Sequence, residues 1–98
     1  MGPSRRVASV VVALALVACT QTSGTARGVV VAVDGDLEQV ASFTVLVDGD
    51  EWMLVPVPDG EYAFALPHLR EHQRTGEPVL VGWELVDNVR YALSLADG

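Results

Sequence analysis

Two histidines that stand four positions apart are the residues of this sequence best suited to bind a metal ion. If their segment is helical, the imidazoles of His68 and His72 are neighbours on one face, because residues four apart are separated by about one turn. Imidazole nitrogen is a common ligand of Zn²⁺ and Cu²⁺, and Glu71 offers a carboxylate beside the pair. Two imidazoles make only half of a tetrahedral site, and the sequence shows no second cluster of ligands to complete it. We therefore expect weak, dispensable metal binding by His68, His72 and Glu71.

The element that must position these histidines is a short helix. Pro67 is typical of a helix start and Gly76 of a helix end, so the segment 66–75 is predicted to be helical. At about 100° per residue, Leu66 and Leu69 form its apolar stripe, and both histidines fall on the exposed or flanking side. Replacing both histidines by alanine is therefore expected to leave the melting temperature nearly unchanged.

The sequence offers little for catalysis. The pentapeptide 68–72 resembles the His-x-x-Glu-His pattern of inverzincin proteases, but a pattern this short is easily met by chance. A chain of 98 residues leaves little room for a third ligand, a cleft and the supporting helices. The sequence also has no Gly-x-Ser-x-Gly elbow and no glycine-rich phosphate loop before a helix. We expect no enzymatic activity and no cofactor.

Hydrophobic residues alternate with polar ones along most of the sequence after residue 27, which predicts β-strands. Five strands are expected, over residues 28–33, 42–47, 52–57, 78–86 and 89–95. Pro56 and Pro58 are expected to end the third strand, because proline cannot donate to a central ladder. The Asp-Gly-Asp sequences at 34–36 and 48–50 are turn signals, and a calcium role is the alternative reading. Asp87-Asn88 predicts a further tight turn.

Five strands with short turns indicate a small antiparallel barrel, and the order of the elements resembles the OB-fold. In that fold a helix between the third and fourth strands closes one end of the barrel, which matches the place of the predicted helix. The resemblance covers residues 28–96 and rests on the order and length of the elements. It implies a mainly β domain over residues 28–98, and the alternation in its strands places Trp83 and Tyr91 in the core.

The first 18 residues have the features of a bacterial secretion signal. Two arginines precede the apolar run 7–17, which as a helix covers roughly 16 Å, about half of a bilayer core. Leu16-Val17-Ala18-Cys19 then resembles the lipobox of short bacterial lipoproteins. The resemblance implies cleavage of residues 1–18, lipid on Cys19, and a protein held at the extracytoplasmic face of the cell membrane. Residues 19–27 are then the lipidated cysteine and a flexible tether. A plain signal peptide and an uncleaved anchor are the alternatives.

The charge of the chain bears on its partners. Without Arg5 and Arg6, the chain has four basic and 13 acidic residues, which gives a net charge of −9. Such a chain repels phosphate backbones, so nucleic acid is not expected as a partner, even for a fold that often binds it. The partners expected are the membrane, through the lipid on Cys19, and a protein of the cell envelope. Exposed strand edges, or Tyr62 and Phe64, are the predicted contact surface.

These observations predict a membrane-anchored, non-enzymatic, protein-binding accessory module of the cell envelope. The alternative is a metal-binding or metal-sensing lipoprotein that uses His68 and His72. A third hypothesis is a binder of small molecules or glycans, whose aromatic side chains would form a stacking platform.

The lipobox interpretation makes a direct prediction about the cysteine. Cys19→Ser should abolish lipid labelling and leave uncleaved precursor in the membrane fraction, because lipid attaches to the thiol and precedes cleavage. Metabolic labelling with a fatty acid, followed by fractionation, measures both effects. If the variant is labelled as strongly as the parent, the lipobox interpretation is wrong.

Overall fold

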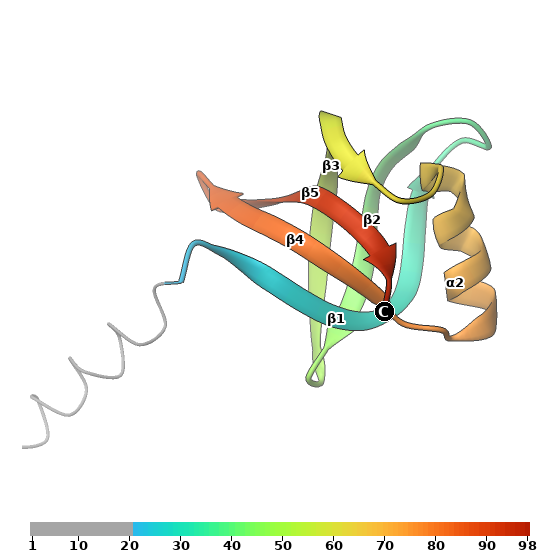
Figure 1. Ribbon diagram of the computed structural model, residues 1–98, viewed down its shortest axis with the longest axis horizontal. Helices are drawn as coiled ribbons and strands as arrows, with labels where there is room; N and C mark the ends of the chain where they lie inside the picture. Colours follow the sequence, from blue (N-terminus) through green and yellow to red (C-terminus); the bar gives the residue numbers. More distant parts are fainter. Residues whose placement is uncertain (1–20) are drawn as a thin grey trace, which may run out of the picture.

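The computed structural model describes residues 21–98, in which five strands form one closed barrel in the order β1-β2-β3-β5-β4 (Figure 1). The strands are β1 (Ser23–Gly35), β2 (Val40–Val47), β3 (Asp50–Tyr62), β4 (Val79–Val86) and β5 (Val89–Asp97). All neighbouring strands are antiparallel except β3 and β5, which are parallel. The predicted mainly β barrel of OB-like topology is confirmed. The predicted signal peptide and Cys19 lie outside the described residues, and no helix in 21–98 has the length and hydrophobicity to span a membrane.

Two short turns connect the hairpins and set their registers. Asp48 and Gly49 join β2 to β3 with φ of 48° and 87°, and Asp87 and Asn88 join β4 to β5 with φ of 50° and 66°. Positive φ at both central residues matches the right-handed twist of the flanking strands. The turns predicted at 48–50 and at 87–88 are confirmed. Asp36 stabilises the loop between β1 and β2. Its side chain accepts hydrogen bonds from the backbone N–H groups of Glu38 and Gln39, and these hydrogen bonds hold the pKa of Asp36 below the ordinary value.

Strand β1 begins five residues earlier than predicted and closes the barrel. Residues 23–28 pair in register with residues 84–79 of β4, and the rest of β1 pairs with β2. The expectation of a flexible tether through Arg27 is therefore wrong from Ser23 onward. The inward positions of this half-strand include Gly24 and Ala26, so it lacks the alternation of large apolar residues that marks a strand in sequence. A strand more than 50 positions further along provides its partner.

Gly28 lies where β1 changes partner from β4 to β2. A Cβ atom at this position would collide with the backbone carbonyl of Leu46 and with the side chain of Val45. The absence of a side chain therefore lets β1 and β2 approach closely enough for one strand to serve both sides of the barrel.

Strand β3 continues through both prolines to Tyr62, so the prediction that Pro56 and Pro58 end it is wrong. The parallel ladder between β3 and β5 is irregular between Pro56 and Glu61, and Pro58 is exposed. Pro56 is the last paired residue before this interruption, and Pro58 lies within it, where the ladder requires no N–H donor.

The hydroxyl of Tyr62 bridges this interruption. It accepts a hydrogen bond from the backbone N–H of Val57 (2.9 Å) and donates one to the carbonyl of Ala92 (2.7 Å). Backbone groups that the ladder leaves without strand partners are thereby satisfied. The barrel remains closed across a segment that contains two prolines.

The interior of the barrel is built from the inward side chains of all five strands, with Phe43, Val45, Leu54, Val79, Val81 and Leu95 among those fully buried. Trp83 is also buried, as predicted, whereas Tyr91 is only half-buried. Trp83 meets the ring of Trp52 edge to face at 5.2 Å. The guanidinium of Arg90 lies 3.9 Å from the Trp52 ring centroid and 4.7 Å from that of Trp83. These indoles therefore pack against each other and against the half-buried guanidinium of Arg90.

Because β1 begins at Ser23, removal of residues 21–27 is predicted to destabilise the barrel. Residues 28–98 alone should be much less stable than residues 21–98, because β4 loses most of its ladder with β1 and the barrel opens. At about 1 kcal/mol for each lost backbone hydrogen bond, we expect a loss of roughly 3–6 kcal/mol. Urea unfolding measures this difference. Thr25→Ala with Arg27→Ala, both exposed, is the control that keeps the backbone and should unfold like the parent. Equal midpoints for the two lengths would contradict the closure by residues 23–27.

Candidate metal site

The predicted helix forms, but in two parts. A 3₁₀ turn, η1 (Leu66–His68), leads into α2 (Leu69–Thr75). The helix ends at Gly76, whose left-handed φ of 77° lets its N–H bond to the carbonyl of His72. It lies beside the C-terminal half of β1, at one end of the barrel (Figure 1).

The structure brings the two histidines together with a third residue that the sequence analysis missed. His68, His72 and Asp97 each place one ligand atom within 4.8 Å of the other two. Asp97 is the last residue of β5 and pairs with Val79, the first residue of β4. Because only three residues separate α2 from β4, this pairing carries Asp97 to the end of the helix.

His72 is buried, with 3% of its surface exposed, so its predicted place on the exposed or flanking side of the helix is wrong. The buried residues of α2 are Leu69 and His72, whereas Leu66 is only half-buried in the 3₁₀ turn. Continuous α-helical geometry from residue 66 gave the wrong phase, because the 3₁₀ turn has fewer residues per turn. The apolar stripe therefore runs from Leu69 to His72.

Both ring nitrogens of His72 have partners. Nδ1 lies 2.8 Å from the backbone carbonyl of Glu77, and Nε2 lies 2.9 Å from Oδ1 of Asp97. A carbonyl oxygen only accepts, so Nδ1 donates and Nε2 is the nitrogen left to face the carboxylate. Two acceptors at this distance need a proton or a cation between them. A hydrogen bond from one imidazole nitrogen to a backbone carbonyl is also how metal-ligating histidines are commonly oriented.

Phe64 fixes both imidazoles from the side. Its ring stacks on that of His72 at 5.3 Å and 30°, and it lies 5.1 Å from the ring of His68. The two imidazoles meet edge to face at 5.1 Å. His68 and Asp97 are exposed, so the cluster has one buried donor and two donors that face solvent.

Glu71, the third predicted ligand, does not converge with the histidines. Its carboxylate forms an ion pair with Arg74, three residues on, and both side chains are exposed. The hydrogen bond from Arg74, together with its charge, holds the pKa of Glu71 below the ordinary value. Glu71 nevertheless borders the same hollow as the histidines, a space of about 160 Å³ that is also lined by Thr75 and Glu77.

Tyr62 and Phe64, predicted to contact a partner, are both half-buried and packed against the core. Their aromatic rings support the β3–β5 junction and the histidines respectively. A role of either residue in binding a protein partner stays a prediction.

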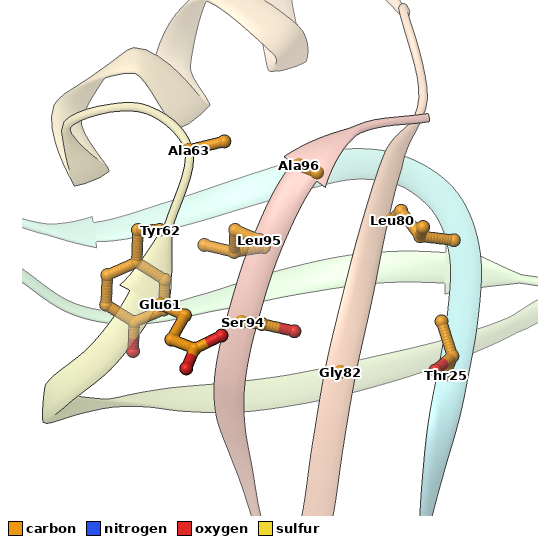
Figure 2. A pocket seen from close by; sticks show the side chains of 9 residues that line it. All are labelled: Thr25, Glu61, Tyr62, Ala63, Leu80, Gly82, Ser94, Leu95 and Ala96. Carbon is orange, nitrogen blue, oxygen red and sulfur yellow. The ribbon is translucent and has the colours of Figure 1, made fainter.

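A larger hollow of about 500 Å³ lies on the outer surface of the barrel, where small side chains cross three strands (Figure 2). One row of paired residues crosses the hollow from strand to strand. It consists of Thr25 on β1, Gly82 on β4, Ser94 on β5 and Glu61 on β3. Gly82 has no side chain, and the Ser94 hydroxyl occupies the space that a Cβ there would need. Glu61 is the one carboxylate among the residues that line it, so no set of metal donors converges there.

Fold and site together define a five-stranded OB-like barrel with a His/His/Asp cluster where its helix meets the end of β5. No protein-family model and no curated protein matches the chain. The crystal structure of Ag(I)CusF aligns with it at a TM-score of 0.57 and 14% identity, over 80% of this chain and 100% of that one. CusF–Ag(I) from Escherichia coli aligns at 0.57 and 15%, over 81% of this chain and 96% of that one.

Apo-CusF from Escherichia coli aligns equally well, with a TM-score of 0.57 at 15% identity, over 82% of this chain and 93% of that one. At these identities the likeness shows the fold: a mainly β, closed five-strand barrel with one short helical segment between β3 and β4.

The burial of His72 corrects the expected effect of substitution on stability. His72→Ala should destabilise the metal-free protein by about 1–3 kcal/mol, because the Glu77 carbonyl loses its donor and a buried ring is removed. His68→Ala, at an exposed position, should stay within about 0.5 kcal/mol of the parent. Urea unfolding in the presence of a chelator measures both values. Equal stability of the two variants would contradict the buried, hydrogen-bonded state of His72.

Proposed function

We propose that this protein binds a divalent transition-metal ion, best matched by Zn²⁺, through His68, His72 and Asp97. The observation that carries the proposal is the orientation of His72. Its Nδ1 is hydrogen-bonded to the backbone carbonyl of Glu77, and its Nε2 is directed at the carboxylate of Asp97. A ring nitrogen of His68 lies in the same cluster. This arrangement supplies three donors, two of them on exposed side chains that an ion reaches from solvent.

The chemistry of the donors supports Zn²⁺ over a soft monovalent ion. Two imidazole nitrogens and one carboxylate oxygen suit Zn²⁺, and Cu²⁺ or Ni²⁺ are related candidates, whereas soft ions such as Cu⁺ prefer thiolate or thioether sulfur. The structures of CusF named above include Ag(I), which supports metal binding as a use of this fold. The donor set of this chain favours a harder cation than Ag(I).

The site supports binding rather than turnover of an organic substrate. Three protein donors leave at least one position of a Zn²⁺ ion for a further ligand. The hollow beside the histidines, about 160 Å³, is smaller than the clefts of several hundred cubic ångströms that enclose small-molecule substrates. We therefore propose a non-enzymatic metal-binding protein.

The place of action that we propose is the extracytoplasmic face of the cell membrane, with lipid on Cys19. Strand β1 begins only four residues after this cysteine, so the barrel would be held close to the bilayer. A protein of the cell envelope that delivers or receives the ion is the proposed partner, because His68 and Asp97 leave the ion accessible from outside. The net charge of −9 without the signal residues favours cations over nucleic acid as ligands.

Calorimetric titration of Zn²⁺ into the purified full-length protein tests the proposal. We expect one saturable site, which weakens at least about tenfold in His68→Ala and in Asp97→Asn, since each variant removes one donor. Asp87→Asn, which changes an exposed carboxylate in the β4–β5 turn, is the matched control and should bind as the parent does. Zn²⁺ at 100 times its dissociation constant should also stabilise the fold by about 2.7 kcal/mol.

Two outcomes would overturn the proposal. One is the lack of any saturable Zn²⁺ site in the parent protein. The other is a site whose affinity is unchanged in both His68→Ala and Asp97→Asn, which would place the ion elsewhere on this acidic surface.

A further inference from the structure

The ion pair between Glu71 and Arg74 stands at the edge of the proposed metal site. Both side chains are largely exposed, at 51% and 69%, and neither makes a further hydrogen bond among the described residues. Glu71 follows His68 by three positions on the same helical segment and borders the hollow that both histidines line. Its carboxylate is thus near the donors but is directed at the guanidinium.

Resting on the proposed function, we propose that Glu71 is the fourth protein ligand of the metal and that Arg74 competes with the metal for it. In the metal-free protein Arg74 holds the carboxylate. When the ion binds, Glu71 rotates from Arg74 to the ion and completes a set of two imidazoles and two carboxylates. When the ion leaves, Arg74 recovers the carboxylate.

The energies of the two states allow this exchange. An exposed ion pair between residues three apart on a helix contributes little to stability, since solvent screens it and two long side chains must be ordered. A carboxylate bonded to Zn²⁺ beside three other ligands gains more than this. The exchange therefore proceeds on binding, while the lost ion pair lowers the affinity of the site by a small, defined factor.

The helix geometry makes Glu71 a better fourth ligand than its neighbours. Thr75 also lines the hollow, but its hydroxyl accepts a hydrogen bond from the backbone N–H of Glu77. Glu77 orients His72 through its backbone carbonyl, and its side-chain carboxylate also borders the hollow. Glu71 is preferred over Glu77 because it follows His68 by three positions on the same helical segment, whereas Glu77 lies beyond the end of α2. Glu71 is the carboxylate that lies between the two histidines in sequence and is held only by an exposed partner.

The competition has a consequence for function. A site whose fourth ligand has an alternative partner releases its ion more readily than a site whose four ligands have no other partner. Such a site suits a protein that passes an ion to a partner in the cell envelope, where the partner's own donor takes the position that Glu71 vacates.

A double-mutant cycle on the full-length protein tests the inference, with Zn²⁺ as the probe and calorimetry as the readout. Glu71→Gln should weaken binding at least about tenfold, because a ligand is lost. Arg74→Gln should strengthen binding about two- to fivefold, because the competitor is lost. In the Glu71→Gln background, Arg74→Gln should no longer strengthen binding. Arg27→Gln, which removes an exposed charge on β1, is the control and should leave the affinity unchanged.

The outcomes separate this inference from the proposed function. If Arg74→Gln strengthens binding equally with and without Glu71, its effect is the general loss of a positive charge and the exchange is wrong. If neither Glu71→Gln nor Arg74→Gln changes the affinity, while His68→Ala and Asp97→Asn still weaken it, the site exists with three ligands and the fourth is not Glu71. If those two variants also bind normally, the proposed site itself is wrong. Unfolding curves measured with a chelator verify that all variants fold.

Discussion

Closure of the barrel by β1 is the constraint on which the rest of the structure depends. This strand pairs with β4 through its first half and with β2 through its second half, and it has register shifts after Val30 and after Asp34 where it bends. The turn between β4 and β5 sets the register of that hairpin and brings the last residue of β5 beside the first residue of β4. By pairing with the other edge of β4, β1 holds this hairpin, and with it Asp97 and the proposed metal site, in the closed barrel.

A buried imidazole is the second constraint. Burying a polar ring without partners is unfavourable, so His72 is compatible with the core only because both of its nitrogens have partners. Those partners come from the loop before β4 and from the end of β5. The same contacts that make the burial tolerable also orient the ring as a ligand, and Phe64 restricts its rotation further. Stability and the capacity to bind an ion therefore rest on the same side chain.

The likeness to CusF concerns the fold alone. A barrel of five strands offers many surfaces, and which ion or partner it binds depends on the side chains placed on them. In this chain, two imidazoles and a carboxylate meet beside the helix, while the indoles of Trp52 and Trp83 are packed around Arg90. The donors, more than the topology, direct the proposal toward Zn²⁺.

Local features of the sequence determined most of the architecture. Alternating side chains identified all five strands, positive-φ turn residues identified both hairpins, and Pro67 and Gly76 marked the ends of the helical segment. These features can be predicted from the sequence because each depends on the conformational preferences of neighbouring residues. The histidine pair could be predicted for the same reason, since its spacing is a property of one helix.

Only the tertiary structure decided the features that join distant segments. Residues 23–27 form a strand because β4 pairs with them. Strand β3 continues past Pro56 and Pro58 because its ladder with β5 is interrupted after Pro56, and the Tyr62 hydroxyl completes that junction. Asp97 joins His72 across 25 positions without any motif, through the register of β4 and β5. Backbone pairing between remote strands requires few particular residue types. The sequence alone therefore predicted neither the start of β1 at Ser23 nor Asp97 as the third donor.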